Sequence, residues 1–220
     1  MNTLRLSDHT IYVQSPGEDA GDTVCPAILL NDGELILRHG LTAQRAYLIG
    51  IVPNDRLSEY TPWLEKALRI GAPDFGGQLE TYHHCLREEI LPALLKAYPL
   101  DAHHLAYGGY SLGGLAAALS LWDPLPVQSV FSLCGSFWYP GAVEFMQTHP
   151  PKQKDARVFL LNGRREGEGH PNRLQFAASY AQQVHALLQD ALDAESVMDD
   201  YQHHDHQADR LRMAIQWAEK

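Results

Sequence analysis

The chain has 220 residues, of which 45% are hydrophobic, and a formal net charge of −10 at neutral pH. A chain of this size can bury one substantial core, so we expect a single domain spanning residues 1–220. Its negative charge disfavours a nucleic-acid or anionic-membrane partner, because both would repel it. The sequence has no run of about 18 apolar residues, which predicts a soluble cytoplasmic protein.

Short apolar runs alternate with longer segments of helical period, which is typical of an α/β protein with a mostly parallel sheet. Residues 15–22 are rich in Gly, Pro and Asp, and we expect a loop there. Helices are expected at 78–91, where Pro92 should end or kink the helix, at 112–121, at 175–192 and near the C-terminus. The predicted strands are residues 10–13, 27–30, 46–52, 104–108, 129–134, 158–161 and 196–201.

The three cysteines, Cys25, Cys85 and Cys134, form an odd set without CxxC spacing. This pattern argues against both a disulfide framework and a zinc site, and we expect no metal and no cofactor. Cys134 ends an apolar run and is interpreted as a small core residue rather than a nucleophile.

The segment Gly109-Tyr110-Ser111-Leu112-Gly113 matches the G-x-S-x-G pattern of a nucleophile elbow. The pattern has its required context, because an apolar strand precedes it and a helix of small residues follows. The turn strains the serine backbone and lifts the hydroxyl out of the sheet. Ser111 is therefore the predicted nucleophile, although an N-cap serine after a glycine turn is the commoner structural role.

An oxyanion formed at Ser111 needs backbone N–H donors. The N–H of Leu112, at the N-terminus of the following helix, is the first candidate. The second should come from an early strand-to-helix turn, and residues 29–33 form such a turn. Gly33, or a neighbouring residue, is therefore the second predicted donor.

A serine nucleophile requires a histidine base and an acidic residue, which follow it in this order in α/β-hydrolases: serine, acid, histidine. The strand at 158–161 breaks at a glycine and leads into a charged loop in which Glu166 is the preferred acid and Glu168 the alternative. The last strand leads into residues 202–206, which contain His203, His204 and His206, and the base is expected there. The same cluster is also compatible with a metal site.

These stretches resemble the putative-esterase family of α/β-hydrolases, which includes enterochelin-esterase-like proteins. The resemblance covers nearly the whole chain, and the segments that carry it best are residues 54–56, 60–63, 75–77, 109–115 and 132–139. The family's Gly-x-x-Glu pattern falls on Gly163 and Glu166. Its Gly-Asn-His motif aligns with Tyr201-Gln202-His203 although the first two residues differ, which implies that His203 is the base.

The resemblance implies hydrolysis of carboxylic esters, including siderophore-type lactones in some relatives, and we expect a small acyl or aryl ester as substrate. Tyr110, Trp63 and Trp138 are candidates to line its pocket, although such aromatics are more often packing residues. Two other functions stay open: a non-catalytic binding module on a hydrolase fold, and a metal-dependent hydrolase that uses residues 203–206. The sequence does not fix the oligomeric state, for which a homodimer is one option.

Overall fold

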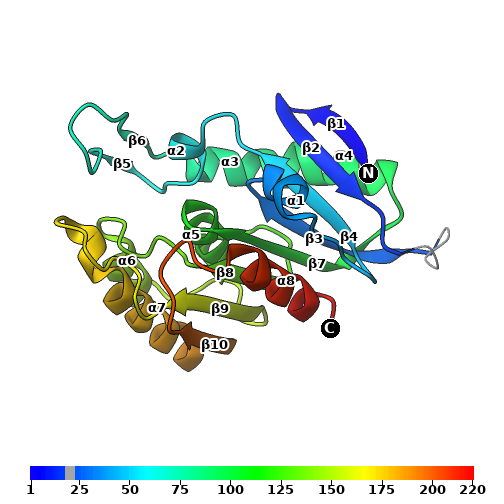
Figure 1. Cartoon of the computed structure of the whole chain (residues 1–220). Coiled ribbons are helices and arrows are strands. Elements are labelled where there is room, and N and C mark those ends of the chain that lie inside the picture. Colours follow the sequence, from blue (N-terminus) through cyan, green and yellow to red (C-terminus); the bar gives the residue numbers. More distant parts are fainter. Residues whose placement is uncertain (18–22) are drawn as a thin grey trace.

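The computed structural model describes residues 1–17 and 23–220. Its main sheet has eight strands in the order β1-β2-β4-β3-β7-β8-β9-β10 (Figure 1). All neighbouring strands from β4 to β10 in this order are parallel. At the N-terminal edge, β1 pairs antiparallel with β2, and β2 pairs antiparallel with β4. The strands are β1 (Asn2–Leu6), β2 (His9–Gln14), β3 (Cys25–Asn31), β4 (Tyr47–Val52), β7 (Leu100–Tyr110), β8 (Ser129–Leu133), β9 (Arg157–Gly163) and β10 (Asp193–Asp199).

Helices cover both faces of this sheet, and the sheet separates the core into two clusters. Helices α1 (Glu34–His39) and α8 (Gln207–Ala218) pack on one face. The other face carries α3 (Leu79–Cys85), α4 (Leu91–Ala97), α5 (Leu112–Leu119), α6 (Ala142–Thr148) and α7 (Ala177–Ala191). Because the central strands are buried on both sides, they appear in the sequence as continuous apolar runs.

All seven predicted strands are present, with two differences. Strand β1 was not predicted, because it is a short edge strand in which only Leu4 and Leu6 are apolar. The last strand was predicted too late in the chain. It ends at Asp199. Tyr201 lies beyond the strand, and its carbonyl oxygen accepts a hydrogen bond from the Arg165 N–H.

The helix predicted at 78–91 continues beyond Pro92, so of the two predicted roles for this proline, ending or kinking the helix, the first is wrong. A π-helical turn at Leu86–Ile90 joins α3 to α4, and Pro92 sits in the first turn of α4. Proline has no N–H, which a first helical turn tolerates because its N–H groups have no intrahelical acceptor. The π-turn adjusts the backbone in front of Pro92. Helices α1 and α6, of six and seven residues, were too short to be predicted from periodicity.

Between β4 and α3 the chain forms α2 (Arg56–Glu59) and then an arm in which β5 (Leu64–Glu65) pairs with β6 (Phe75–Gly76). Figure 1 shows this arm projecting from the body of the molecule.

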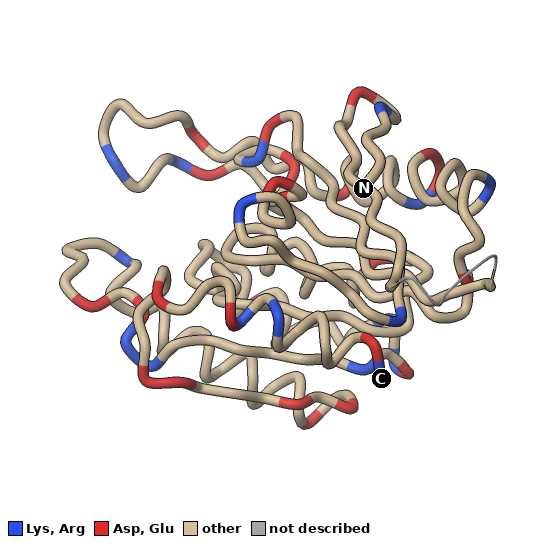
Figure 2. Tube along the Cα trace, turned by 45° about the vertical axis from the view of Figure 1, so that its right-hand side comes forward, with Lys and Arg blue, Asp and Glu red and all other residues tan. Residues whose placement is uncertain are grey.

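The predicted loop at 15–22 lies mostly outside the described residues. In the view of Figure 2, Lys and Arg segments are interspersed with acidic ones along the chain. Among the described residues, no helix combines the length and the apolar character needed to cross a membrane.

Candidate active site

Strand β7 turns sharply into helix α5 at Ser111, whose φ of 61° lies in the left-handed region. Such a backbone is strained for a residue with a side chain. The turn also depends on Gly109, because a Cβ atom there would lie 2.5 Å from the carbonyl carbon and oxygen of Gly113. The elbow expected from the sequence is therefore formed, and it presents the Ser111 side chain at the C-terminal end of the sheet.

The Ser111 hydroxyl lies 3.1 Å from Nε2 of His203, and Nδ1 of the same ring lies 2.8 Å from Oε2 of Glu166. Glu166 follows β9, and His203 lies between β10 and α8, so the turns after three different strands bring the three side chains together. Only 4% of Glu166 is exposed. The two distances are those expected for hydrogen bonds within a triad of serine, histidine and acid.

Glu166 is held as a carboxylate although it is buried. Burial raises its pKa, but the hydrogen bond from His203, the attraction of that ring when it is protonated, and the hydrogen bond from the Gly163 N–H together bring the pKa below its usual value. Its Oε1 accepts from Gly163 at 2.7 Å and from Nδ2 of Asn162 at 3.1 Å. Since an ionised carboxylate only accepts hydrogen bonds, Nδ1 of His203 carries the proton and Nε2 is free to accept one from Ser111.

Glu168, the alternative acid, lies elsewhere. Its side chain is half-exposed and pairs with Arg165 at 2.8 Å. Two positions along one loop therefore place one carboxylate behind His203 and the other at the surface.

The His203 segment is anchored by Arg210, which is 2% exposed. Its guanidinium pairs with Asp199 through two nitrogens, at 2.6 and 2.8 Å. A third nitrogen donates to the Tyr110 hydroxyl and to the carbonyl oxygen of Gln202, and the Tyr110 hydroxyl donates to the carbonyl oxygen of His203. One buried cation thus connects the end of β7 to the segment that holds His203.

His204 and His206 do not gather with His203 into a metal site. His204 meets the His203 ring edge to face, whereas His206 packs on Tyr201. Within residues 1–17 and 23–220, the group with converging metal-ligand atoms is instead Cys134, Glu166 and His203. Two of these three residues already form the acid and histidine pair.

The two predicted oxyanion donors differ in the structure. Leu112 begins α5, where the first N–H groups have no intrahelical acceptor. Of the prediction that Gly33 or a neighbouring residue is the second donor, the choice of Gly33 is wrong, because its N–H donates to the carbonyl oxygen of Ile51 at 2.9 Å. The N–H of Asp32 is also used, donating to the Tyr60 hydroxyl at 2.9 Å. Among the described residues, the next N–H along the chain, that of Glu34, begins helix α1 and has no acceptor.

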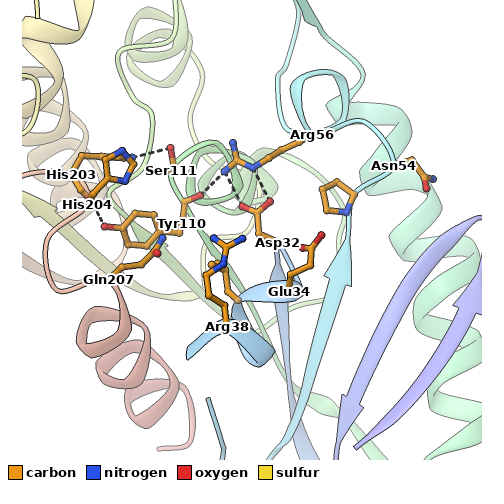
Figure 3. A pocket seen from close by; sticks show the side chains of 12 residues that line it. Asp32, Glu34, Arg38, Asn54, Arg56, Tyr110, Ser111, His203, His204 and Gln207 are labelled. Carbon is orange, nitrogen blue, oxygen red and sulfur yellow. Dashed lines mark hydrogen bonds and ion pairs between the residues drawn. The ribbon is translucent and has the colours of Figure 1, made fainter. Parts of the chain in front are cut away.

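Two cavities meet at Ser111. The larger, of about 490 Å³, is lined by Ser111, His203 and charged residues that include Glu34 and Arg38 (Figure 3). The smaller, of about 320 Å³, also reaches Ser111 and His203, and its wall includes Trp138. Both volumes suit small-molecule ligands.

The three predicted pocket aromatics have different positions. Tyr110 lines the larger cavity and Trp138 the smaller one. Trp63 lines neither, so its assignment to the pocket was wrong. Its indole N–H donates to the Pro140 carbonyl oxygen at 2.9 Å, and its ring packs against Tyr139 and Phe145. Trp63 therefore serves to pack the arm against the body.

Sequence reasoning missed two features next to the nucleophile. Arg56 forms a bidentate pair with Asp32 at 2.7 and 2.8 Å and donates to the Tyr110 carbonyl oxygen at 3.3 Å, which braces the elbow. The buried hydroxyl of Ser136 lies 3.3 Å from that of Ser111. Both residues lie in segments that carry the family resemblance, and this was the available signal.

The sheet order, the elbow after β7 and the helices on both faces define an α/β-hydrolase. Residues 6–216 match the sequence profile of the putative-esterase family, and the chain belongs to this family. It is 31% identical over 209 residues to the uncharacterized protein YbbA of Bacillus subtilis (strain 168), a match that covers 84% of this chain and 82% of that one. Family and fold together make it a serine hydrolase of the esterase class.

Solved structures of similar fold include two hydrolases. An IroE-like serine hydrolase from Shewanella oneidensis superposes with a TM-score of 0.79 at 16% identity, covering 99% of this chain and 78% of that one. The siderophore hydrolase EstA from Aspergillus nidulans superposes with a TM-score of 0.73 at 17% identity, covering 96% of this chain and 89% of that one. At these identities the similarity establishes the fold.

Proposed function

We propose that this protein hydrolyses a carboxylic ester through an acyl-enzyme on Ser111, with His203 as general base and Glu166 as the acid that orients it. The observation that carries the proposal is the unbroken series of contacts from the Ser111 hydroxyl through the imidazole of His203 to the buried Glu166 carboxylate. No other described side chain places a base at Ser111 together with an orienting acid.

In the first half of the reaction, the Ser111 oxygen attacks the ester carbonyl carbon while Nε2 of His203 takes the hydroxyl proton. The resulting imidazolium is stabilised by Glu166. The tetrahedral oxyanion accepts hydrogen bonds from the N–H of Leu112 and, as we further propose, from that of Glu34, which replaces the assignment to Gly33. The intermediate collapses when the leaving alkoxide takes the proton from Nε2.

In the second half, His203 removes a proton from a water molecule that attacks the acyl carbonyl carbon, and Ser111 leaves with that proton. The two cavities at Ser111 give the acyl and alcohol parts of an ester separate places, with Tyr110 and Trp138 in their walls. We propose a small acyl or aryl ester as substrate. A siderophore-type lactone is the second candidate, and the similarity of fold to the siderophore hydrolase EstA favours it.

Catecholate siderophores bound to iron are polyanions, and the three arginines considered as their partners are already paired with carboxylates. Arg56 lines the larger cavity but is paired with Asp32. Arg164 and Arg165 are half-exposed and pair with Asp200 and Glu168. This distribution favours the smaller ester.

The test is covalent labelling with a fluorophosphonate, which reacts with activated serines. We expect one adduct per chain, located by mass spectrometry on the peptide that contains Ser111, and hydrolysis of a short-chain aryl ester that stops once labelling is complete. Labelling should be unaffected by a chelator. A folded protein that neither reacts nor hydrolyses any ester of a broad panel would instead be a non-catalytic binding module on this fold.

A further inference from the structure

Behind Glu166, three polar side chains continue the hydrogen-bonded series away from Ser111. Nδ2 of Asn162 lies 3.1 Å from Oε1 of Glu166, and Oδ1 of Asn162 lies 3.0 Å from Nε2 of His185. Nδ1 of His185 then lies 2.8 Å from the hydroxyl of Ser196. The three residues come from β9, α7 and β10, so the series passes through the packing between a helix and the sheet.

Asn162 and His185 are almost completely enclosed, and Ser196 is half-buried. Asn162 is 1% exposed and His185 is 3% exposed. His185 packs edge to face against Phe137 and lies within the field of Glu166. Burying an amide and an imidazole is costly unless their hydrogen bonds are made, and here both donors and both acceptors are used. The sequence at these positions therefore maintains polar groups where apolar ones would pack at lower cost.

Chemistry fixes the direction of every hydrogen bond in the series. The Glu166 carboxylate can only accept, so Asn162 presents its NH₂ group to it and its oxygen to His185. Burial lowers the pKa of His185 to about 4, so the ring is neutral at neutral pH and has one N–H. That N–H must be at Nε2, facing the Asn162 oxygen, and Nδ1 accepts from the Ser196 hydroxyl. All three donors point towards Glu166.

This order determines what each oxygen of Glu166 does. Oε1 accepts from Gly163 and Asn162, which leaves Oε2 to accept from Nδ1 of His203. If the N–H of His185 were lost, Oδ1 of Asn162 would lose its partner and the amide would no longer be held in place against Oε1. Glu166 would then be free to move or rotate away from His203.

We propose that Asn162, His185 and Ser196 are positioning residues that hold Glu166 in the orientation in which it accepts from His203. The proposal rests on the proposed function, since it assigns these residues to the reaction through Glu166. It predicts an effect on turnover rather than on substrate binding, because none of the three residues lines a cavity that contains Ser111.

The experiment compares His185→Leu and His185→Gln, each made in the wild type and in Glu166→Gln. In the wild type, His185→Leu should lower kcat about tenfold, because Asn162 loses the hydrogen bond that holds its amide against the Glu166 carboxylate, with KM little changed. His185→Gln keeps an N–H donor at the position of Nε2 and should restore most of this loss. In the Glu166→Gln background, His185→Leu should change kcat less than twofold, because the group it positions is already gone.

A merely structural role would give a different result, namely the same fractional loss in both backgrounds, and this would overturn the proposal. So would unchanged kcat in a folded His185→Leu protein. His83→Leu is the matched control, because His83 is also a buried histidine but contacts Asp123 instead of the triad, and its kcat should be unchanged. If His185→Leu does not fold, Ser196→Ala at the far end of the series should show a loss of about twofold to fivefold, again only when Glu166 is present.

A measurement that needs no substrate separates this proposal from the proposed function. The proton on Nδ1 of His203 gives a low-field NMR signal, assigned by its disappearance in His203→Ala. We expect His185→Leu to shift this signal to higher field and His185→Gln to leave it near its wild-type position. If the wild type hydrolyses no ester but the signal shifts as expected, the esterase proposal fails and the positioning series stands. An unshifted signal overturns the series whatever the activity.

Discussion

The two sides of Ser111 are built in opposite ways. Behind the serine, His203 leads to Glu166, which is 4% exposed and accepts from three different groups. In front of it, the larger cavity is walled by exposed charged side chains such as Glu34 and Arg38. The buried side fixes one geometry through hydrogen bonds that cannot be left unmade. The open side places few constraints on the backbone, and selectivity there depends on individual side chains.

The largest effect is expected at the point where the two sides meet. Ser111→Ala should lower the turnover of a short-chain aryl ester by about 10⁵-fold or more, because no acyl-enzyme can form, while the fold is retained. Ser136→Ala, which removes only the neighbouring hydroxyl, should cost less than tenfold. Steady-state kinetics with circular dichroism as a folding control measures both. Near-wild-type turnover in folded Ser111→Ala would remove the serine mechanism.

The next effect contrasts a buried with an exposed carboxylate on one loop. Glu166→Gln should lower kcat by roughly 10³- to 10⁴-fold, because the amide carries no charge and can stabilise the wrong tautomer of His203. Glu168→Gln should change kcat less than twofold, since its partner is the half-exposed Arg165. Equal kcat values for wild type and Glu166→Gln would mean that Ser111 and His203 act as a dyad.

The buried side also depends on Arg210, which connects Asp199 to the His203 segment. Arg210→Met should lower the free energy of unfolding by roughly 3 kcal/mol, because it leaves Asp199 unpaired and Tyr110 without a donor. It should also lower kcat by about ten- to a hundredfold as the His203 carbonyl loses its anchoring. Urea unfolding and kinetics at a temperature where the variant is folded separate the two effects. Loss of stability without loss of kcat would show that Arg210 serves the fold alone.

The pH dependence of stability tests whether His185 is neutral in the folded protein. Unfolded histidine has a pKa of about 6.5, whereas burial lowers that of His185 to about 4. Between these values the unfolded state binds the extra proton, so the free energy of unfolding should fall as the pH falls through this window, by roughly 3 kcal/mol in all. Urea unfolding should show a smaller fall in His185→Gln. Parallel curves for the two proteins would contradict a neutral His185.

The contrast between the two sides also explains what the sequence could predict. The elbow was predictable because Gly109, Ser111 and Gly113 lie within five consecutive residues and each meets a local steric requirement. Strand order predicted which loops would carry the acid and the base, and the family resemblance then singled out Glu166 and His203 within them. In both cases the signal is local or follows from topology.

What could not be predicted depends on contacts between distant segments. The prediction that Gly33 donates to the oxyanion failed because its N–H already donates to the Ile51 carbonyl oxygen, which belongs to another strand. Trp63 was assigned to the pocket on its aromatic character alone, and only the folded arm shows it bound to Pro140. The contact between Asn162 and His185 joins residues 23 positions apart and has no pattern in the sequence.

The smallest effect is expected on the open side, at Arg38. This residue is exposed, lines the larger cavity, and forms no ion pair with any residue that the structure describes. Its charge should favour esters that carry a carboxylate. Arg38→Gln should therefore lower kcat/KM for such an ester about threefold relative to a neutral ester of the same shape, since an exposed charge pair is worth at most about 1 kcal/mol. Glu34, four residues earlier and in the same cavity, keeps the effect small.

The ratio of the two kcat/KM values, rather than either alone, is the measurement, because it cancels any change in the catalytic groups. In about 1 M salt the difference between wild type and Arg38→Gln should disappear, since charges are screened beyond roughly 3 Å. Arg164→Gln, at an exposed pair with Asp200 outside both cavities, should leave the ratio unchanged at any salt concentration. A change in kcat for both esters in Arg38→Gln would place Arg38 with the buried machinery, and the division between the two sides of Ser111 would then be wrong.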